Sequence, residues 1–200
     1  MGIFDFFRKK RLSKDEPLDS SDGQYENEEE RREALLMLSR QLSLDNEDVV
    51  LEVNESLLTP HAYCEKWQDR LDDRGISVPF KELSWIAMVD ALIEERMAEE
   101  FDWKTESTIV LYTIRKLIAR KQLLPQDMDW SEFDFMEDLP TAEALEIMKN
   151  KLKPYEIALA SVDILSDSYV LITVPFEELV ELKRLASKAG YRIVDHFVSS

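Results

Sequence analysis

Hydrophobic residues recur at helical spacing through residues 31–124. Apolar positions three and four residues apart give each helix one apolar stripe, which is typical of helices that pack together. The third stripe follows Thr59 and Pro60, an N-cap residue and a proline suited to the first helical turn, and Gly75 stops that helix. The pattern predicts a bundle of five helices, with apolar stripes Ala34, Leu35, Leu38 and Leu42; Val49, Val50, Val53 and Leu57; Tyr63, Cys64, Trp67 and Leu71; Leu83, Ile86, Val89, Leu92, Ile93 and Met97; and Ile109, Val110, Ile114, Leu117 and Ile118.

Strand-like segments appear in the C-terminal part. Residues 157–163 and 169–174 are rich in β-branched and apolar side chains, and the turn-forming residues 164–168 separate them, so they predict a hairpin. The second strand is apolar on both faces, which indicates that both faces are covered. We expect the helix after Pro175 to cover one face and the helix around Ile86 and Val89 to cover the other, with Val170, Ile172 and Val174 on one side and Tyr169 and Leu171 on the opposite side.

Helices flank this hairpin on both sides in the sequence. Residues 140–152 predict one helix, and Pro175 opens another that Gly190 ends. Residues 191–198 predict a returning strand, and residues 101–104 a short extended piece between the fourth and fifth helices of the bundle. The expected fold class is α+β: an N-terminal helical bundle that shares a core with a small C-terminal antiparallel sheet built as hairpin, helix and strand.

The charge pattern divides the chain. Residues 1–11 combine apolar side chains with a basic cluster, and residues 12–30 are acidic with no helical or strand period, which predicts a disordered linker. We therefore expect a single α+β domain over residues 31–200. Within it, residues 31–124 are helical, 125–139 form an acidic loop, and 140–200 form the α+β part.

The N-terminal segment is a candidate docking element. On a helix its apolar residues share one side, and the cations that follow could lie over anionic lipid. The segment is too short to span a bilayer. It does not resemble a secretory signal, because in such signals the basic residues precede the apolar run and here they follow it. Phe6 stands where the myristoylation pattern requires Ser or Thr. Two interpretations of this segment stay open: it docks to a membrane or a partner, or it folds back on its own domain. The residues concerned are Ile3, Phe4, Phe6, Phe7, Arg8, Lys9, Lys10 and Arg11.

Composition and charge argue against a nucleic-acid-binding protein and against a disulfide-stabilised one. The chain has 200 residues with 42 acidic and 25 basic side chains, a formal net charge of -17. Direct nucleic-acid binding is disfavoured, because the phosphate backbone carries the same sign of charge. One cysteine excludes an internal disulfide framework and suits a reducing cytoplasm, and four glycines leave no Gly-rich phosphate loop.

His61 and Cys64 lie one helical turn apart and are a candidate metal or thiol pair. A zinc site needs three or four ligands, and the other histidine, His196, belongs to the last predicted strand. Cys64 also falls on the apolar stripe of its helix, which favours a buried, inert thiol.

Acidic residues alternate at the start of the loop as they do in a calcium-binding loop. The pattern Asp127, Asp129 and Ser131 fits, but Glu132 stands where the turn needs glycine, and Asp138 where a bidentate glutamate is usual. The pattern therefore favours an acidic surface loop over a calcium site.

Catalytic motifs are absent from the sequence. There is no G-x-S-x-G elbow, and two histidines offer little choice of general base. Asp102, Asp163 and Asp167 are the acidic residues next to the clearest predicted elements. We interpret Asp167 as a turn residue and Asp102 as a partner of Lys104 or a helix cap. The sequence thus predicts no catalytic residue, cofactor or metal, and an enzyme remains the alternative.

Three short motifs resemble a known family. Asp102-Trp103-Lys104 follows a long apolar helix, Ser166-Asp167-Ser168-Tyr169 lies between two strands, and Gly190-Tyr191-Arg192-Ile193 opens the last strand. Over residues 31–198 this combination resembles an uncharacterised bacterial family, a domain of unknown function (the 6630 family). The resemblance implies a bacterial cytoplasmic protein and brings no activity or catalytic residues with it.

The function predicted from the sequence is non-enzymatic protein–protein binding by an acidic cytoplasmic protein. Complementary charge would favour a basic partner, as for an immunity protein that neutralises a basic toxin. Two alternatives stay open: an enzyme or ligand sensor with a pocket in the α+β half, and an adaptor held at the inner membrane surface by residues 1–11.

Overall fold

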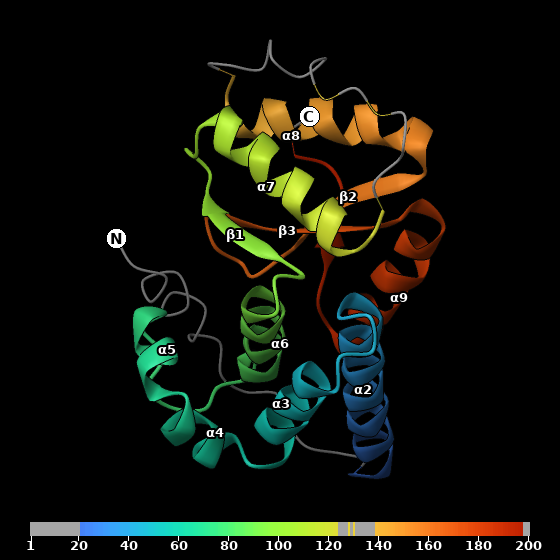
Figure 1. Ribbon diagram of the computed structural model, residues 1–200. Coiled ribbons are helices and arrows are strands. Elements are labelled where there is room, and N and C mark those ends of the chain that lie inside the picture. Colours follow the sequence, from blue (N-terminus) through green and yellow to red (C-terminus); the bar gives the residue numbers. More distant parts are fainter. Residues whose placement is uncertain (1–20, 124–127, 129, 131–138, 198–200) are drawn as a thin grey trace, which may run out of the picture.

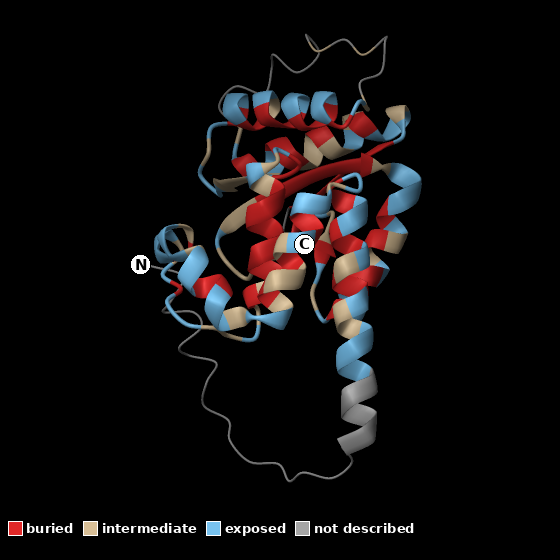
Figure 2. Cartoon of the chain, turned by 60° about the horizontal axis from the view of Figure 1, so that its bottom comes forward, coloured by how far each residue is buried: buried red, intermediate tan, exposed pale blue. Residues whose placement is uncertain are grey.

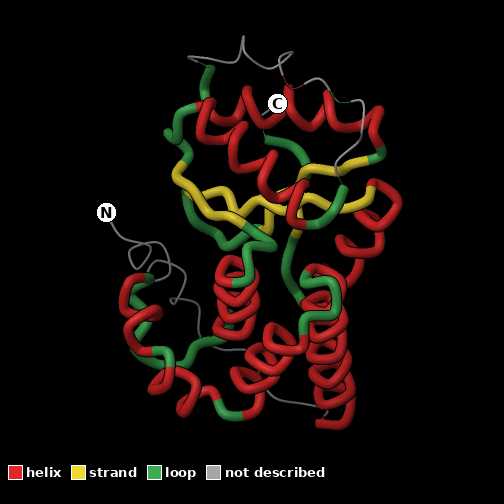
Figure 3. Tube along the Cα trace, viewed as in Figure 1, coloured by secondary structure: helices red, strands yellow, loops and turns green. Residues whose placement is uncertain are grey.

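The computed structural model describes residues 21–123, 128, 130 and 139–197. The predicted docking segment 1–11 and the calcium-like residues Asp127, Asp129, Ser131, Glu132 and Asp138 lie outside these ranges. The elements, shown in Figures 1 and 3, are α2 (Ser21–Leu42), α3 (Glu47–Leu58), α4 (Pro60–Lys66), α5 (Gln68–Asp73), α6 (Leu83–Glu94), β1 (Glu99–Asp102), α7 (Ser107–Arg120), α8 (Thr141–Leu152), η2 (Lys153–Tyr155), β2 (Ile157–Val162), β3 (Ser168–Pro175), η3 (Phe176–Glu178), α9 (Leu179–Ala189) and β4 (Ile193–Val194).

One antiparallel sheet has the strand order β1-β3-β2-β4. The predicted hairpin is confirmed as β2 and β3, paired from Ile157 opposite Pro175 to Val162 opposite Val170. The extended piece predicted over residues 101–104 lies in and just after β1, which adds a strand from the helical half to the sheet edge. The α+β fold class is confirmed.

Helices cover both faces of the sheet (Figures 1 and 2). Ala160 and Ile172 belong to one buried cluster with side chains of α2, α3, α6 and α9, whereas Leu159 and Leu171 belong to a second cluster with α7 and α8. Coverage of both faces is therefore confirmed. The helical half contributes to the cover of the other face through α7, which packs there with α8. The particular helix expected there is wrong, because α6 lies on the same side of the sheet as α9.

The last strand is shorter than residues 191–198. Only Ile193 and Val194 pair with β2. A continued strand would place Ile193 and Phe197 on the same face. In the structure Ile193 joins the cluster with α9 and Phe197 joins the cluster with α7 and α8, so the backbone must leave the sheet between them.

The first helix begins before the predicted domain start. α2 runs from Ser21, although residues 12–30 were expected to form a disordered linker. From residue 27 onward its first buried side chain is Ala34, and residues 27–30 are exposed. Packing of the later turns supplies the stability, and adding helical residues to an existing helix is far less costly than nucleating one. An exposed polar segment can thus be helical without an apolar period.

The third predicted helix is divided into α4 and α5 at Trp67. The Thr59 hydroxyl does not cap it, because Thr59 Oγ1 donates to the Glu55 carbonyl of the preceding helix. Gly75 follows α5 with a positive φ of 70°, as its predicted role requires. The helix after Pro175 is a short 3-10 turn followed by α9, and its apolar residues Phe176 and Val180 are exposed.

Candidate functional site

Two of the three family-like motifs meet beside β1 at one edge of the sheet, whereas the third leads into β4 at the opposite edge. Asp102 ends β1 and lies opposite Ser168, which begins β3. Trp103 and Lys104 follow directly, and with Tyr169 they line a hollow of about 720 Å³ beside the first turns of α7 and α8. The structure thus brings together Asp102, Trp103, Lys104, Ser166, Asp167, Ser168 and Tyr169, which are far apart in the sequence.

Local backbone geometry explains most of the polar groups at this edge. Asp102 Oδ1 accepts from the Lys104 amide at 2.8 Å, and Ser166 Oγ accepts from the Ser168 amide at 3.1 Å. Asp163 Oδ1 accepts from the Leu165 amide at 2.8 Å. The expectation that Asp102 caps the next helix is wrong, since Glu106 is the N-cap residue of α7. The bonds that the structure gives Asp102 and Ser166 are those of turns. Asp163 Oδ2 also accepts from Arg192 Nη2 at 2.6 Å, which joins this turn to the segment before β4.

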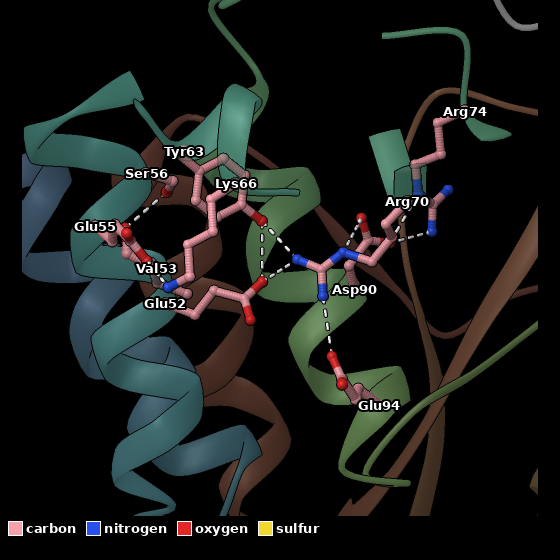
Figure 4. A network of polar contacts seen from close by, with 10 residues as sticks. All are labelled: Glu52, Val53, Glu55, Ser56, Tyr63, Lys66, Arg70, Arg74, Asp90 and Glu94. Atoms are coloured by element: carbon pink, nitrogen blue, oxygen red, sulfur yellow. Dashed lines mark hydrogen bonds and ion pairs between the residues drawn. The ribbon is translucent and has the colours of Figure 1, made fainter. Parts of the chain in front are cut away.

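A buried network of charged side chains joins α3, α4, α5 and α6 (Figure 4). Arg70 lies at its centre: Nη2 donates to Glu52 and, at 2.7 Å, to the Tyr63 hydroxyl, and Nη1 donates to Glu94 at 3.0 Å. Tyr63 in turn donates to Glu52 at 2.9 Å. Arg70 Nε lies 3.6 Å from Asp90 Oδ2. One guanidinium therefore links three carboxylates on two helices.

A second arginine extends this network to the sheet. Arg74 Nε donates to Asp90 Oδ1 at 2.7 Å, and Nη2 donates to Glu100 at 2.7 Å. Arg74 follows α5, Asp90 lies in the middle of α6, and Glu100 lies in β1. These contacts fix the end of α5 against both elements.

The network is buried at Asp90 and Glu52, opens to solvent at Glu94, and has an excess of negative charge. The Asp90 side chain is only 4% exposed, and two arginines face the four carboxylates of Glu52, Asp90, Glu94 and Glu100. Burial raises the pKa of Asp90 although Arg74 and Arg70 oppose it, and burial likewise raises the pKa of Glu52 against the pull of Arg70 and Tyr63. Both acids are therefore costly to keep ionised.

Three buried polar atoms in this region have no hydrogen-bond partner among the described residues: Asp90 Oδ2, Arg70 Nε and Trp67 Nε1. Such atoms are uncommon in folded proteins. Arg70 Nε and Asp90 Oδ2 face each other at 3.6 Å as an ion pair, too far apart for a hydrogen bond. All three belong to residues that line one hollow of about 930 Å³.

We call this hollow the acidic groove; α4, α5, α6 and β1 form its walls. Its cations are already engaged, since Lys66 pairs with Glu55 at 2.6 Å and Arg70 and Arg74 belong to the network. Four of its carboxylates form no ion pair or hydrogen bond with any described residue. They are Glu65, Asp69, Asp73 and Glu99.

Trp67 lies between the two short helices and lines the same groove. The Arg70 guanidinium carbon is 4.1 Å from its ring centroid and Lys66 Nζ is 5.2 Å away. An aromatic face attracts cations by its quadrupole. The groove therefore combines carboxylates with a ring that already holds two cationic groups.

The metal and thiol candidates stay apart. Cys64 is buried, as expected from its place on the apolar stripe; its thiol is free, and burial raises its pKa. His61 and His196 are exposed. In residues 21–123 and 139–197, no three His, Cys, Asp or Glu side chains are placed to hold a metal ion.

Sequence reasoning did not identify the network, although signals for it were present. Asp90 is the lone acid within an otherwise apolar stretch of α6, and a buried acid needs a partner. Arg70 and Arg74 are four residues apart and so face the same side of a helix. These two patterns together would have indicated a buried ion pair.

Comparisons with other proteins identify a family. No helix in the described part of the chain is long and apolar enough to cross a bilayer. No curated protein and no solved structure gives a significant match. A family model matches residues 34–197, the stretch that contains the groove, the sheet and the three motifs. The chain belongs to the family described as a domain of unknown function, DUF6630.

Proposed function

We propose that this chain is a protein-binding module whose acidic groove receives a basic segment of a partner protein. The observation that carries the proposal is the set of carboxylates without partners in the groove, the rim residues Glu65, Asp69, Asp73 and Glu99. Lysine and arginine side chains of the partner would pair with them, and complementary charge would speed the encounter.

The interior of the groove supports the same partner chemistry. Beneath the rim, Glu52, Asp90, Glu94 and Glu100 outnumber Arg70 and Arg74, so the negative charge of the groove is only partly neutralised from within. A cationic segment that lay in the groove would therefore meet carboxylates both at the rim and beneath it.

The finer form of the proposal is an immunity-like role in the cytoplasm. Toxins that attack nucleic acid carry basic surfaces, because they must approach phosphate. An acidic groove that covers such a surface would neutralise the toxin by competition. The free thiol of Cys64 suits a reducing compartment.

The test measures binding of a labelled peptide of alternating Arg and Gly by fluorescence anisotropy at physiological salt, with a Glu–Gly peptide as the negative probe. The groove variant replaces the four rim carboxylates by their amides: Glu65→Gln, Asp69→Asn, Asp73→Asn and Glu99→Gln. A control variant makes the same change in net charge at exposed acids outside the groove: Glu29→Gln, Glu33→Gln, Asp45→Asn and Glu177→Gln.

We expect the groove variant to lose about 10-fold or more in affinity for the basic peptide and the control to lose about 2-fold or less. An equal loss in both variants would show that net charge alone attracts the peptide, and the groove would have no specific role. Absence of binding by the unchanged chain would reject the proposal outright.

A further inference from the structure

The outer face of α7 has a chemistry opposite to that of the acidic groove. Residues 103–120 contain four basic side chains, all exposed, and one acidic one, whereas residues 27–102 contain 20 acidic and eight basic side chains. The sheet separates α7 from α2 and α6, as Figure 1 shows. Acidic side chains therefore predominate in residues 27–102, and basic side chains predominate on α7.

Large apolar side chains are exposed on this basic side. Tyr112 is 60% exposed, Trp103 51% and Ile109 50%. Ile109, Tyr112 and Lys116 follow one another at helical spacing, so they form one stripe on α7. The opposite side of the helix, with Val110, Ile114, Leu117 and Ile118, is buried against the sheet. The core therefore does not need the exposed stripe.

Cations stand directly over the exposed rings. Lys116 Nζ lies 4.6 Å from the Tyr112 ring centroid, and Lys104 Nζ lies 4.7 Å from that of Trp103. Arg120 is exposed one turn further along the helix. We call this set, Trp103, Lys104, Ile109, Tyr112, Lys116 and Arg120, the α7 face.

We propose that the α7 face docks on an anionic membrane surface. Tryptophan and tyrosine favour the headgroup region of a bilayer, where an apolar ring and a polar edge are both satisfied. Ile109 would enter the acyl boundary beside them, and the cations would lie over anionic headgroups. The acidic helices on the other side of the sheet would point away from the lipid. At physiological salt the screening length is about 8 Å, so beyond that distance their repulsion of anionic headgroups would be weak.

The apolar stripe favours a lipid surface over nucleic acid. A phosphate backbone would engage Lys104, Lys116 and Arg120 but would leave Ile109 and Tyr112 in water. A bilayer interface takes up both kinds of side chain. This docking mode differs from that of residues 1–11, which belong to another part of the chain.

The experiment sediments the full chain with vesicles of phosphatidylcholine alone and with vesicles that contain phosphatidylglycerol. The α7 variant carries Lys104→Gln, Lys116→Gln and Arg120→Gln, and a control variant carries the same change in charge at exposed cations elsewhere, Lys81→Gln, Arg184→Gln and Lys188→Gln. A third variant replaces Arg8, Lys9, Lys10 and Arg11 by serine.

We expect binding only to vesicles with anionic lipid, and at least a 10-fold loss of binding in the α7 variant with little change in the control. Tyr112→Ser, which changes no charge, should also weaken binding several-fold. Brominated lipid should quench the tryptophan fluorescence of the bound chain, and Trp103→Phe should lose most of that quenching.

Several results would overturn the inference. They are equal binding of the α7 variant and the unchanged chain, loss of binding only in the variant at residues 8–11, and no association with anionic vesicles. Tighter binding to duplex DNA or to an acidic polypeptide than to vesicles, with no effect of Tyr112→Ser, would assign the face to a different class of partner.

Discussion

Asp90 shows how a single residue shapes the groove. It lies in a helix whose neighbouring positions Val89, Ala91 and Leu92 are all buried in the core. An unpaired carboxylate at this buried position would destabilise the fold, so the ionised form of Asp90 depends on its ion pairs with Arg74 and Arg70. Replacing a buried ion pair with apolar residues is often neutral or stabilising. Its presence beside an open hollow therefore fits a binding role better than a purely structural one.

Lys121 is a second buried charge, and it gives a pH-dependent prediction. Its ammonium group donates to the Leu42 carbonyl at the end of α2, at 3.1 Å, and burial lowers its pKa to about 8 from an ordinary value of 10.5. Between pH 8 and 10 the unfolded chain keeps this proton while the folded chain loses it. The free energy of unfolding contributed by Lys121 should therefore rise over this range, by about 2 kcal/mol.

Urea unfolding of the wild type and of Lys121→Met at pH 8, 9 and 10 measures this contribution. Cys64 and Tyr191 have raised pKa values and act in the opposite direction, but both proteins contain them. The difference in unfolding free energy between the two proteins isolates Lys121. A difference that stays constant from pH 8 to 10 would contradict the lowered pKa.

Gly190 is required by backbone geometry. Its φ is +91°, a region that is costly for any residue with a Cβ, and a Cβ built there would meet the Arg31 guanidinium. Gly190→Ala should lower the free energy of unfolding by about 1–2 kcal/mol. Ser187→Ala, at an exposed position in the same helix, should change it by less than about 0.5 kcal/mol. Equal stability of the two variants in thermal unfolding would show that the strain is absent.

Elements with a strong period were predictable from the sequence. The stripe Ala34, Leu35, Leu38 and Leu42 is buried in α2, and the alternation around Ile172 identified a strand covered on both faces. Elements without a period were not predictable. Residues 27–30 of α2 are exposed, and β1 is four residues long, so their structure depends on packing by neighbouring segments.

α5 is held mainly by ions. Leu71 is its one buried residue among six, so apolar packing gives this helix little support. Arg70 and Arg74 join its end to α6 and β1. Arg74→Met should loosen the segment from Pro60 to Gly75 locally, because it breaks two of these contacts and leaves Asp90 with one partner.

Hydrogen exchange followed by mass spectrometry would measure that effect. Amides of residues 68–75 should exchange at least 10-fold faster in Arg74→Met, while amides of β2 and β3 keep their rates. Arg96→Met, which removes an exposed cation just after α6, serves as the control and should leave both regions unchanged. Uniformly faster exchange throughout the chain would instead mean that α5 is part of the global unfolding unit.

At the scale of the whole molecule, the sheet separates two surfaces of opposite charge. The helices on one side provide the acidic groove, and α7 provides the basic face on the other. The sequence indicated the net charge of -17, but the separation depends on topology, because α6 and α7 are neighbours in the chain and lie on opposite faces of the sheet. For the same reason, residues as distant as Glu52 and Glu100 could not be placed in one network from spacing alone.

Residues 31–200 are expected to unfold as one cooperative domain. Ile172 is fully buried in a cluster with side chains of α2, α3, α6 and α9, so a charge there would lie in a dry site between the helices and the sheet. Ile172→Asp should cost several kcal/mol and unfold the helices together with the sheet. The readout is the helical circular dichroism signal during heating. Val180→Asp places the same charge at a position that is 76% exposed and should melt like the wild type. If the helices of Ile172→Asp melt at the wild-type temperature, residues 31–124 and 140–200 are separate folding units, and the expectation of a single domain is wrong.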